Sequence, residues 1–202
     1  MMNNHYITFV DIQAEKSEVK LFIDGDAITI GLTDFEENNI PRSGSIDDLT
    51  FDLIKHFELK LHCMKKAVKA LSYSALNSFK LKQKLSKDFP SEIIDEIVLT
   101  LSSKKYIDDE YLASRAAESY CYGKLYGPKK IRLQLYAKGF KQFEIDDALA
   151  IIPEDDYFNN MEKLKNKKSK SFDEEVEIDA LKDLFFKYGY TDRQIYEYIQ
   201  NL

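Results

Sequence analysis

Hydrophobic positions divide the chain into two regions with different periods. Residues 6–33 alternate between apolar and polar side chains, as half-buried β-strands do. From Ser45 onward the apolar residues recur at steps of three and four, which is typical of amphipathic helices. We therefore predict a mainly α-helical protein with a small antiparallel β extension at its N-terminus.

The alternating region predicts a meander of about three strands. In its first strand, the alternation places Ile7 and Phe9 on one face and Val10 on the other. Asp24-Gly25 favours a turn, because Asp suits turn positions and Gly tolerates a positive φ. Three strands alone cannot bury a core, so we expect the sheet to dock on the rest of the chain or on a partner.

The first long helix is expected to begin near Ser45. Ser45 and Asp48 resemble a capping box, with Asp in place of the usual Glu. Large apolar residues then follow at helical spacing and predict a buried stripe, which consists of Ile46, Leu49, Leu53, Phe57, Leu61, Met64, Val68 and Leu71.

The helical region contains an internal repeat of about fifty residues. Segments 81–101, 131–152 and 181–202 each contain an apolar-stepped helix, then an aromatic residue, then a second helix. The aromatic residues are Phe89, Phe140 and Tyr190, and the isoleucines five residues later are Ile94, Ile145 and Ile195. Such a repeat predicts tandem three-helix bundles that bury their faces against one another in an elongated array.

Four parts are predicted along the chain. Residues 1–44 form the β-rich extension, and 45–107 form a linker helix and the first three-helix repeat. Residues 108–157 form the second repeat, and 158–202 form the third.

The central repeat holds the most distinctive helix of the sequence. Pro128 suits the first helical turn, where its missing N–H has no cost. Ile131 and Leu135 share a face and are expected to be buried. Gly139 fits the left-handed position that ends a helix. The buried face is expected to be widened by Leu133, Tyr136 and Ala137.

The formal net charge of −6 conceals strong segregation of charge. Residues 62–90 hold seven Lys and one Asp, and residues 123–142 hold six basic residues and no acidic one. Residues 143–160 hold six acidic residues and no basic one. Such blocks can be solvated faces that pair within a unit, or a repeated basic stripe for a long polyanionic or acidic partner.

No feature of the sequence predicts secretion or a membrane span. The N-terminus lacks the basic, apolar and small-residue regions of a signal peptide. No apolar run approaches the roughly 20 residues that cross a bilayer. Cys63 and Cys121 lie in helical patterns without a disulfide framework. We expect a cytoplasmic protein.

Catalytic and metal chemistry have little support in the sequence. His62-Cys63 with the distant Cys121 lacks a zinc spacing, and buried helical cysteines are the simpler interpretation. Residues 108–110 are acidic and fit an exposed helix start better than a cation site. Neither a glycine-rich phosphate loop nor a catalytic triad is recognisable. We expect no enzymatic activity and no cofactor.

Several segments together resemble the RecX family of regulatory proteins. The central one is "YGPKKIRLQLYAKGF", residues 126–140, with its Gly-Pro, basic helix and Lys-Gly-aromatic ending. "ALSYSALNSFKLKQKL", residues 70–85, resembles the first repeat of that family, and "YIDDEYLASRAAESY", residues 106–120, resembles the link into the second. "LFIDGDAITIGL" and "SGSIDDLTFDLI" resemble its β-rich extension. The first repeat departs from the pattern because it lacks the Lys-Gly pair.

The resemblance implies a regulator without catalytic chemistry and a curved array of three-helix units. RecX proteins bind the RecA recombinase and its nucleoprotein filament in the helical groove. They restrain its ATPase and strand-exchange activity and limit filament growth, in DNA repair and the SOS response. Some members also bind DNA, which implies single- or double-stranded DNA as a further partner. Charge segregation favours a monomer.

The partner-binding residues implied in this way are basic side chains of two repeats: Lys124, Lys129, Lys130, Arg132, Lys138, Lys80, Lys82 and Lys84. Lys138 can instead serve the C-terminus of its own helix, where cations are favoured. The alternative function is a tandem helical DNA-binding module that acts without RecA. Residues 129–138 offer mostly Lys and apolar side chains, whereas base reading uses Asn, Gln and Arg.

Overall fold

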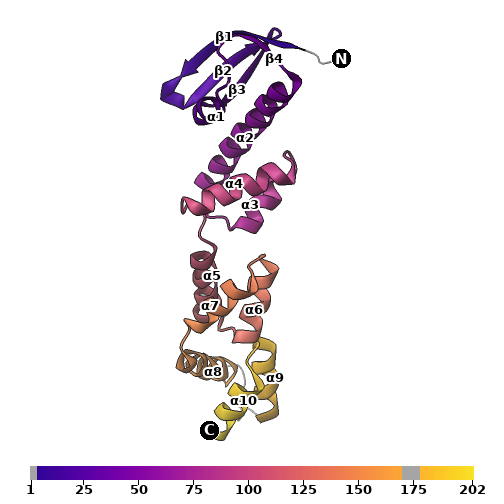
Figure 1. The fold of residues 1–202 in the computed structure, drawn as a ribbon. Helices are drawn as coiled ribbons and strands as arrows, with labels where there is room; N and C mark the ends of the chain where they lie inside the picture. Colours follow the sequence, from indigo (N-terminus) through magenta and orange to yellow (C-terminus); the bar gives the residue numbers. More distant parts are fainter. Residues whose placement is uncertain (1–3, 170–177) are drawn as a thin grey trace. The chain divides into compact units, whose positions relative to one another are not determined.

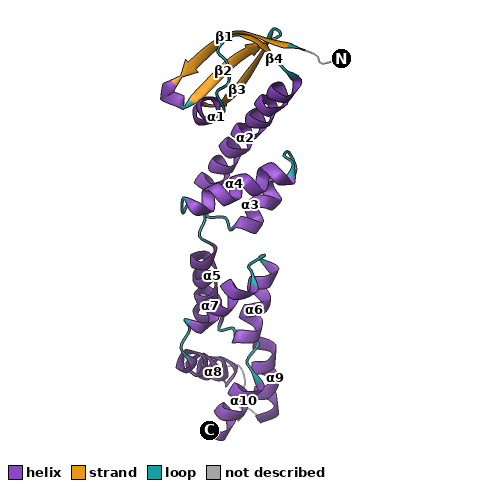
Figure 2. Cartoon of the chain, viewed as in Figure 1, coloured by secondary structure: helices purple, strands orange, loops and turns teal. Residues whose placement is uncertain are grey.

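The computed structural model describes residues 4–169 and 178–202 and is mostly helical, with ten α-helices and a small sheet in these residues (Figures 1 and 2). The chain divides into two compact units. Unit 1 comprises residues 1–76 and 81–106, and unit 2 comprises residues 77–80 and 107–202. The predicted fold class is confirmed. The finer division into an extension and three repeats stays a prediction, and part of its third repeat, residues 170–177, lies outside the described residues.

The sheet of unit 1 has four antiparallel strands in the order β3-β2-β1-β4. These are β1 His5–Gln13, β2 Glu18–Ile23, β3 Asp26–Gly31 and β4 Gly44–Ile46. Asp24 and Gly25 both have a positive φ, 52° and 93°, and make the predicted two-residue turn between β2 and β3. The expectation of about three strands missed β4, which pairs with the start of β1 through His5 and Ile46.

The first strand does not keep the simple alternation that its sequence predicts. Ile7 pairs with Ile23 whereas Phe9 pairs with Phe22, so the register shifts between them. An extra residue in one strand turns the following side chains to the opposite face. Ile7 is therefore buried while Phe9 is exposed, and Val10 packs against the core. Placing Ile7 and Phe9 on one face was wrong for this reason.

Helix α2, Asp48–Tyr73, covers the inner face of the sheet, as Figure 1 shows. Its Ile54 and Phe57 pack into one buried cluster with Leu21 and Ile30 of the strands. Phe35 of the short helix α1, Leu32–Glu37, joins the same cluster. The prediction that the sheet docks on the rest of the chain is confirmed.

The start and the buried face of α2 differ from the sequence expectation. Asp47, not Ser45, caps the helix, since its Oδ1 accepts a hydrogen bond from the backbone N–H of Thr50 at 2.9 Å. Leu49, Leu53 and Val68, all expected in the buried stripe, are exposed. The residues of α2 that are buried are Ile54, Phe57, Cys63, Ala67 and Ala70. Small side chains line the C-terminal half of this face, which allows α4, Ser91–Ser103, to pack against the helix.

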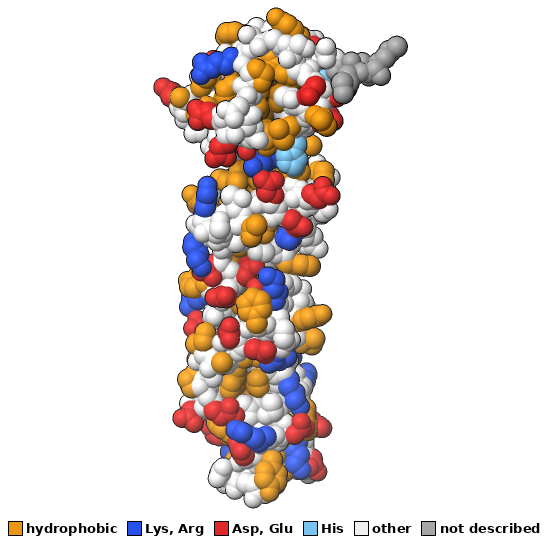
Figure 3. Space-filling view, in the orientation of Figure 1, with side chains coloured by type: hydrophobic (Ala, Val, Ile, Leu, Met, Phe, Trp, Pro, Cys, Tyr) orange, Lys and Arg blue, Asp and Glu red, His pale blue; other side chains and the backbone are white. Residues whose placement is uncertain are grey.

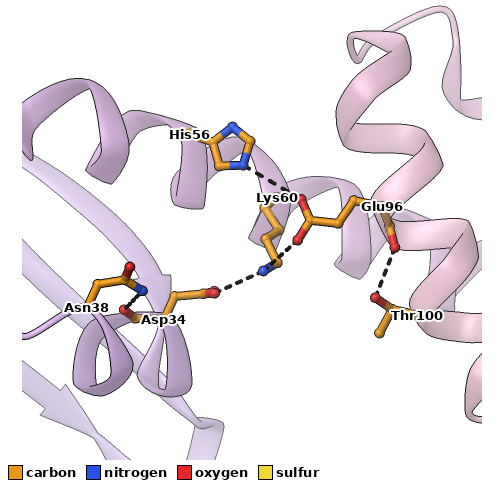
Figure 4. Close-up of polar contacts among 6 residues, drawn as sticks. All are labelled: Asp34, Asn38, His56, Lys60, Glu96 and Thr100. Carbon is orange, nitrogen blue, oxygen red and sulfur yellow. Dashed lines mark hydrogen bonds and ion pairs between the residues drawn. The ribbon is translucent and has the colours of Figure 1, made fainter. Parts of the chain in front are cut away.

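A polar cluster ties α1, α2 and α4 together (Figure 4). The ammonium of Lys60 lies 3.0 Å from a carboxylate oxygen of Asp34 and 2.8 Å from one of Glu96. Burial disfavours the charged form of Lys60, but its hydrogen bonds to Glu96 and Asp34 outweigh this and raise the pKa of the ammonium. His56 approaches the same Glu96 at 3.6 Å. Lys60 therefore holds the sheet layer and α4 to the long helix.

Unit 2 is built from helices around one core. They are α5 Asp109–Glu118, α6 Pro128–Ala137, α7 Gln142–Ala150, α8 Glu154–Ser169, α9 Ile178–Tyr188 and α10 Asp192–Gln200. Helix α3, Ser78–Leu85, begins in this unit. A short π-helical turn, Ser119–Gly123, follows α5. Among the described residues, none of the helices has the length and hydropathy needed to cross a membrane.

The sequence repeat appears in unit 2 as repeated geometry. Gly139 and Gly189 both have a left-handed φ, 84° and 85°, and each ends a helix. The aromatic residues that follow them, Phe140 and Tyr190, are both buried in the core. Two copies of one helix–glycine–aromatic–helix pattern therefore share a single core.

Candidate partner interface on helix α6

The N-terminal end of α6 is fixed by a backbone contact with the turn between α9 and α10. Gly127 donates its N–H to the carbonyl oxygen of Tyr188 at 2.8 Å, and Lys129 donates its N–H to that of Gly189 at 2.9 Å. The hydroxyl of Tyr190 donates to the carbonyl oxygen of Leu125 at 3.0 Å. Pro128 occupies the first helical turn, as predicted. This docking sets which side of α6 faces outward.

The buried side of α6 is narrower than the sequence predicts. Ile131 and Leu135 are fully buried, as expected. Leu133 and Tyr136 were expected to widen this face, but they are 63% and 70% exposed, and Ala137 is exposed as well. Periodicity identifies the centre of an apolar stripe but not which of its edges a neighbour covers. In unit 2 the neighbouring helices cover Ile131 and Leu135 and leave Leu133 and Tyr136 exposed.

The side chain of Lys130 contacts other residues of unit 2 rather than extending freely into solvent. Its Nζ lies 4.3 Å from the ring centroid of Tyr126 and 5.4 Å from that of Tyr188. The same ammonium donates a hydrogen bond to the carbonyl oxygen of Lys187 at 3.0 Å. These contacts are cation–π interactions reinforced by a charge-assisted hydrogen bond. Lys130 is one of the predicted partner-binding residues, and its observed contacts give it a structural role; partner binding by it stays a prediction.

Lys129 and Arg132 each have a carboxylate partner within the unit. Lys129 pairs with Asp192 at 2.7 Å, and Arg132 pairs with Asp146 at 2.5 Å. The hydrogen bond from Lys129 lowers the pKa of Asp192. Hydrogen bonds from Gln142 and then from Arg132 lower the pKa of Asp146. Basic and acidic blocks thus pair here, although both ion pairs are exposed and such pairs exchange readily for external partners.

The remaining predicted residues have varied surroundings. Lys138 lies with its Nζ 4.9 Å from the ring centroid of Tyr120, and its carbonyl oxygen accepts a hydrogen bond from Asn77 at 3.0 Å. Lys82 pairs with Asp95 at 2.5 Å. Within residues 4–169 and 178–202, no hydrogen bond or ion pair engages the ammonium of Lys80, Lys84 or Lys124.

The structure brings five of the predicted residues onto or beside one helix. Lys129, Lys130, Arg132 and Lys138 belong to α6 or its end, and Lys124 precedes it. Lys80 lies at the start of α3 in unit 2, whereas Lys82 and Lys84 belong to unit 1. On the face drawn in Figure 3, basic side chains lie interspersed with acidic ones rather than forming one continuous basic surface.

Sequence reasoning missed the exposed apolar residues of this surface. Lys129, Leu133 and Tyr136 follow at steps of four and three, so they lie on one face of α6. Arg132 lies one helical turn before Tyr136, beside them. We call Lys129, Arg132, Leu133 and Tyr136 the α6 face. Their spacing was visible in the sequence, but only the packing of the unit shows that the face is uncovered.

The cysteines and acidic residues do not assemble into a second kind of site. Cys63 and Cys121 are both buried, and burial raises the pKa of each thiol to about 11. The acidic residue Asp108 caps α5 by accepting a hydrogen bond from the N–H of Tyr111 at 3.0 Å. Across the described part of the chain, no three His, Cys, Asp or Glu side chains gather in a way that could hold a metal ion.

Similar proteins come from several bacteria. The regulatory protein RecX of Clostridioides difficile is 27% identical over 130 residues, which are 64% of this chain and 61% of that protein. The regulatory protein RecX of Oceanobacillus iheyensis is 32% identical over 119 residues, or 57% of this chain and 44% of that protein. The matches therefore span less than two thirds of the length of either relative. The RecX protein of Bacillus pumilus is 23% identical over 203 residues, covering 95% of this chain and 77% of that protein.

Solved structures agree on the fold, although no family model matches the sequence. A crystal structure of regulatory protein RecX has a TM-score of 0.80 and 21% identity, covering 98% of this chain and all of the other. RecX from Lactobacillus salivarius has a TM-score of 0.67 and 23% identity, covering 72% of this chain and 97% of the other. The fold is shared along nearly the whole chain, and the curated relatives carry one name. In sequence the chain is similar to regulatory proteins named RecX from several bacteria, and it shares the fold of the RecX structures.

Proposed function

We propose that this protein binds the RecA recombinase and its nucleoprotein filament and inhibits its ATPase, recombinase and filament-extension activities. It would act in the cytoplasm as a non-enzymatic regulator of DNA repair and the SOS response, with DNA of the filament as a further contact. Similarity in sequence to regulatory proteins named RecX supports this function. The structural observation that carries it is the α6 face, where Leu133 and Tyr136 are uncovered beside Lys129 and Arg132.

The composition of the α6 face favours a protein partner over DNA alone. Tyr and Arg are enriched where protein interfaces carry most of their binding energy, and an exposed Leu beside them adds apolar area. The cations of this face already pair with Asp192 and Asp146 at the surface. Acidic groups of a partner can replace such exposed carboxylates at little net cost. A rim of exchangeable charges around two apolar side chains is a suitable surface for RecA.

The alternative, a DNA-binding module that acts without RecA, needs base-reading side chains on a helix that enters a groove. Of the base-reading residue types, α6 offers only Arg132, which pairs with Asp146, and Gln134, which is partly buried. This arrangement gives little means of reading a sequence. Tight duplex binding in the absence of RecA, with a steep dependence on salt, would favour the alternative.

The test of the proposed function is DNA-dependent ATP hydrolysis by the cognate RecA, with this protein added below the RecA concentration. Strong inhibition at substoichiometric amounts is expected, because a regulator of filament extension acts at few sites per filament. An unchanged ATPase rate with excess folded protein would refute the proposal. Titration of a labelled RecA filament then separates weak binding from binding without inhibition.

A further inference from the structure

We propose that unit 1 carries a separate binding site for single-stranded nucleic acid, in a groove between α2 and α3. The groove has a volume of about 520 Å³ and is lined by His62, Lys65, Lys66, Lys69, Ala70, Tyr73 and Lys84. The proposed function places the RecA contact on α6 and assigns no residues to DNA. This inference goes beyond it, because it assigns a free single strand to named residues of unit 1 and requires no RecA. Of its lining residues, only Lys84 was predicted from the sequence to bind a partner.

The charged side chains that line the groove are all basic. Four lysines and one histidine line it, and no acidic residue does. Two of the lysines have partners outside the lining: Lys65 pairs with Glu18 at 2.8 Å and Lys66 with Asp88 at 2.5 Å. Within the described ranges, Lys69 and Lys84 make no side-chain hydrogen bond or ion pair. The groove therefore keeps a positive excess whose clearest members are Lys69 and Lys84, one from each helix.

The spacing of the lysines suits a chain of anionic groups better than one small anion. Lys65, Lys69 and Tyr73 follow at steps of four along α2, so successive members are about 6 Å apart along the helix axis. Lys84 faces the same space from α3. Lysine binds phosphate as a flexible point charge, without the fixed two-pronged geometry of arginine. A row of such charges can follow the phosphates of a flexible strand.

Tyr73 gives the groove a surface for a nucleobase. It is the last residue of α2, it lines the groove, and it is 76% exposed. Proteins that bind single strands combine a basic groove with aromatic rings on which unpaired bases stack. The bases of a duplex are already stacked on one another, which makes a single strand the better fit. An acidic peptide would satisfy the lysines but offers no flat ring to Tyr73.

The experiment measures fluorescence anisotropy of a labelled oligo-dT strand with the full-length protein and no RecA. Three variants probe the groove: Lys69→Glu with Lys84→Glu, Tyr73→Ala, and Tyr73→Phe. The matched control is Lys16→Glu with Lys104→Glu, which changes the net charge equally at two exposed lysines of unit 1 outside the groove. All four substituted lysines lie outside the buried clusters, and circular dichroism confirms that each variant is folded.

We expect wild-type binding to weaken with salt and the double groove variant to lose at least tenfold in affinity. The salt dependence of its binding should become shallower. The slope of the logarithm of the association constant against the logarithm of the salt concentration should be less negative by about 0.7 for each phosphate that the variant no longer neutralises. Tyr73→Ala should bind oligo-dT with roughly five- to 150-fold lower affinity, which is the usual effect of removing one stacking ring. Tyr73→Phe keeps the ring and should keep the affinity. The control double variant should bind much more tightly than the double groove variant.

Three results would overturn the inference. One is a wild-type protein that does not bind oligo-dT at low salt. Another is an equal loss of affinity in the double groove variant and the control double variant, which would show that only the net charge of the protein matters. The third is tighter binding of labelled poly-glutamate than of oligo-dT, which would assign the groove to an acidic peptide. Because RecA is absent from these measurements, none of them bears on the proposed RecA interface.

Discussion

Gly127 and Gly189 approach each other so closely that neither has room for a side chain. A Cβ atom on Gly127 would lie 2.6 Å from the carbonyl carbon and oxygen of Gly189. A Cβ atom on Gly189 would collide with Lys130 in turn. The Gly-Pro start of α6 is thus the point where two copies of the repeat meet, and it orients the α6 face.

Gly127→Ala and Gly189→Ala should each destabilise unit 2. Gly189 also has a φ of 85°, where an L-residue costs about 1–2 kcal/mol before any collision is counted. We expect Gly189→Ala to lower the free energy of unfolding by at least that amount in chemical denaturation. Gly123→Ala is the matched control, since a Cβ there meets nothing within 4 Å. Equal stability of all three variants would show that the close approach does not exist in solution.

Leu135→Asp and Leu133→Asp compare the two sides of α6 with the same substitution. Leu135 is fully buried, so the aspartate would place an unpaired charge in the core, at a cost of about 3–5 kcal/mol. Leu133 is exposed, and surface substitutions usually change stability by about 0.5 kcal/mol or less. Thermal unfolding should show a large loss for Leu135→Asp alone. A comparable loss for Leu133→Asp would mean that Leu133 is covered in the folded protein.

Lys130→Met should destabilise unit 2 while Lys124→Met should not. Methionine keeps the apolar stem of Lys130 but removes the cation that faces Tyr126 and Tyr188, and exposed cation–π pairs contribute about 0.5–1 kcal/mol each. Lys124 is exposed and, among the described residues, has no such ring beside it. Urea unfolding of both variants measures the difference. A stable Lys130→Met would show that the two tyrosines do not hold the ammonium.

Lys60→Met should lose stability in a way that depends on pH. The folded pKa of Lys60 is raised above its ordinary value of 10.5, because its hydrogen bonds to Glu96 and Asp34 outweigh the penalty of burial. A raised pKa of a base stabilises the fold fully below pH 10.5, and this contribution is lost as the pH rises through the folded pKa. The stability difference between wild type and Lys60→Met should therefore be constant near neutrality and shrink above pH 10.5. Lys60→Arg, which keeps the charge, should show no such shrinkage. A stability difference between wild type and Lys60→Met that does not change with pH would show that the charge of Lys60 does not stabilise the fold.

The repeat and its turn residues could be predicted from the sequence because they are local. Gly139 and Gly189 are required by a left-handed backbone, and the buried Phe140 and Tyr190 follow them at once. The turn at Asp24-Gly25 was predictable for the same reason. Such features depend on a few consecutive residues and need no knowledge of distant contacts.

The outward face of α6 and the groove of unit 1 could not be predicted, because both depend on packing. Leu133 lies next to a buried stripe in sequence, and only the position of the neighbouring helices leaves it exposed. Phe9 lies on the opposite face from the one predicted, because the strand register shifts between Ile7 and Phe9 and the alternation pattern does not reveal this shift. Lys69 and Lys84 are fifteen residues apart in the sequence and line one groove only in the folded unit.

The most direct test of the RecA interface compares two double variants in the DNA-dependent ATPase assay of RecA. Leu133→Ala with Tyr136→Ala removes the apolar part of the α6 face. Leu99→Ala with Tyr106→Ala is the matched control, since these residues of unit 1 are 72% and 68% exposed. We predict that inhibition by the α6 variant requires at least tenfold more protein than wild type, whereas the control inhibits as wild type does. Undiminished inhibition by the α6 variant, with both proteins folded, would contradict the assignment of RecA binding to this face.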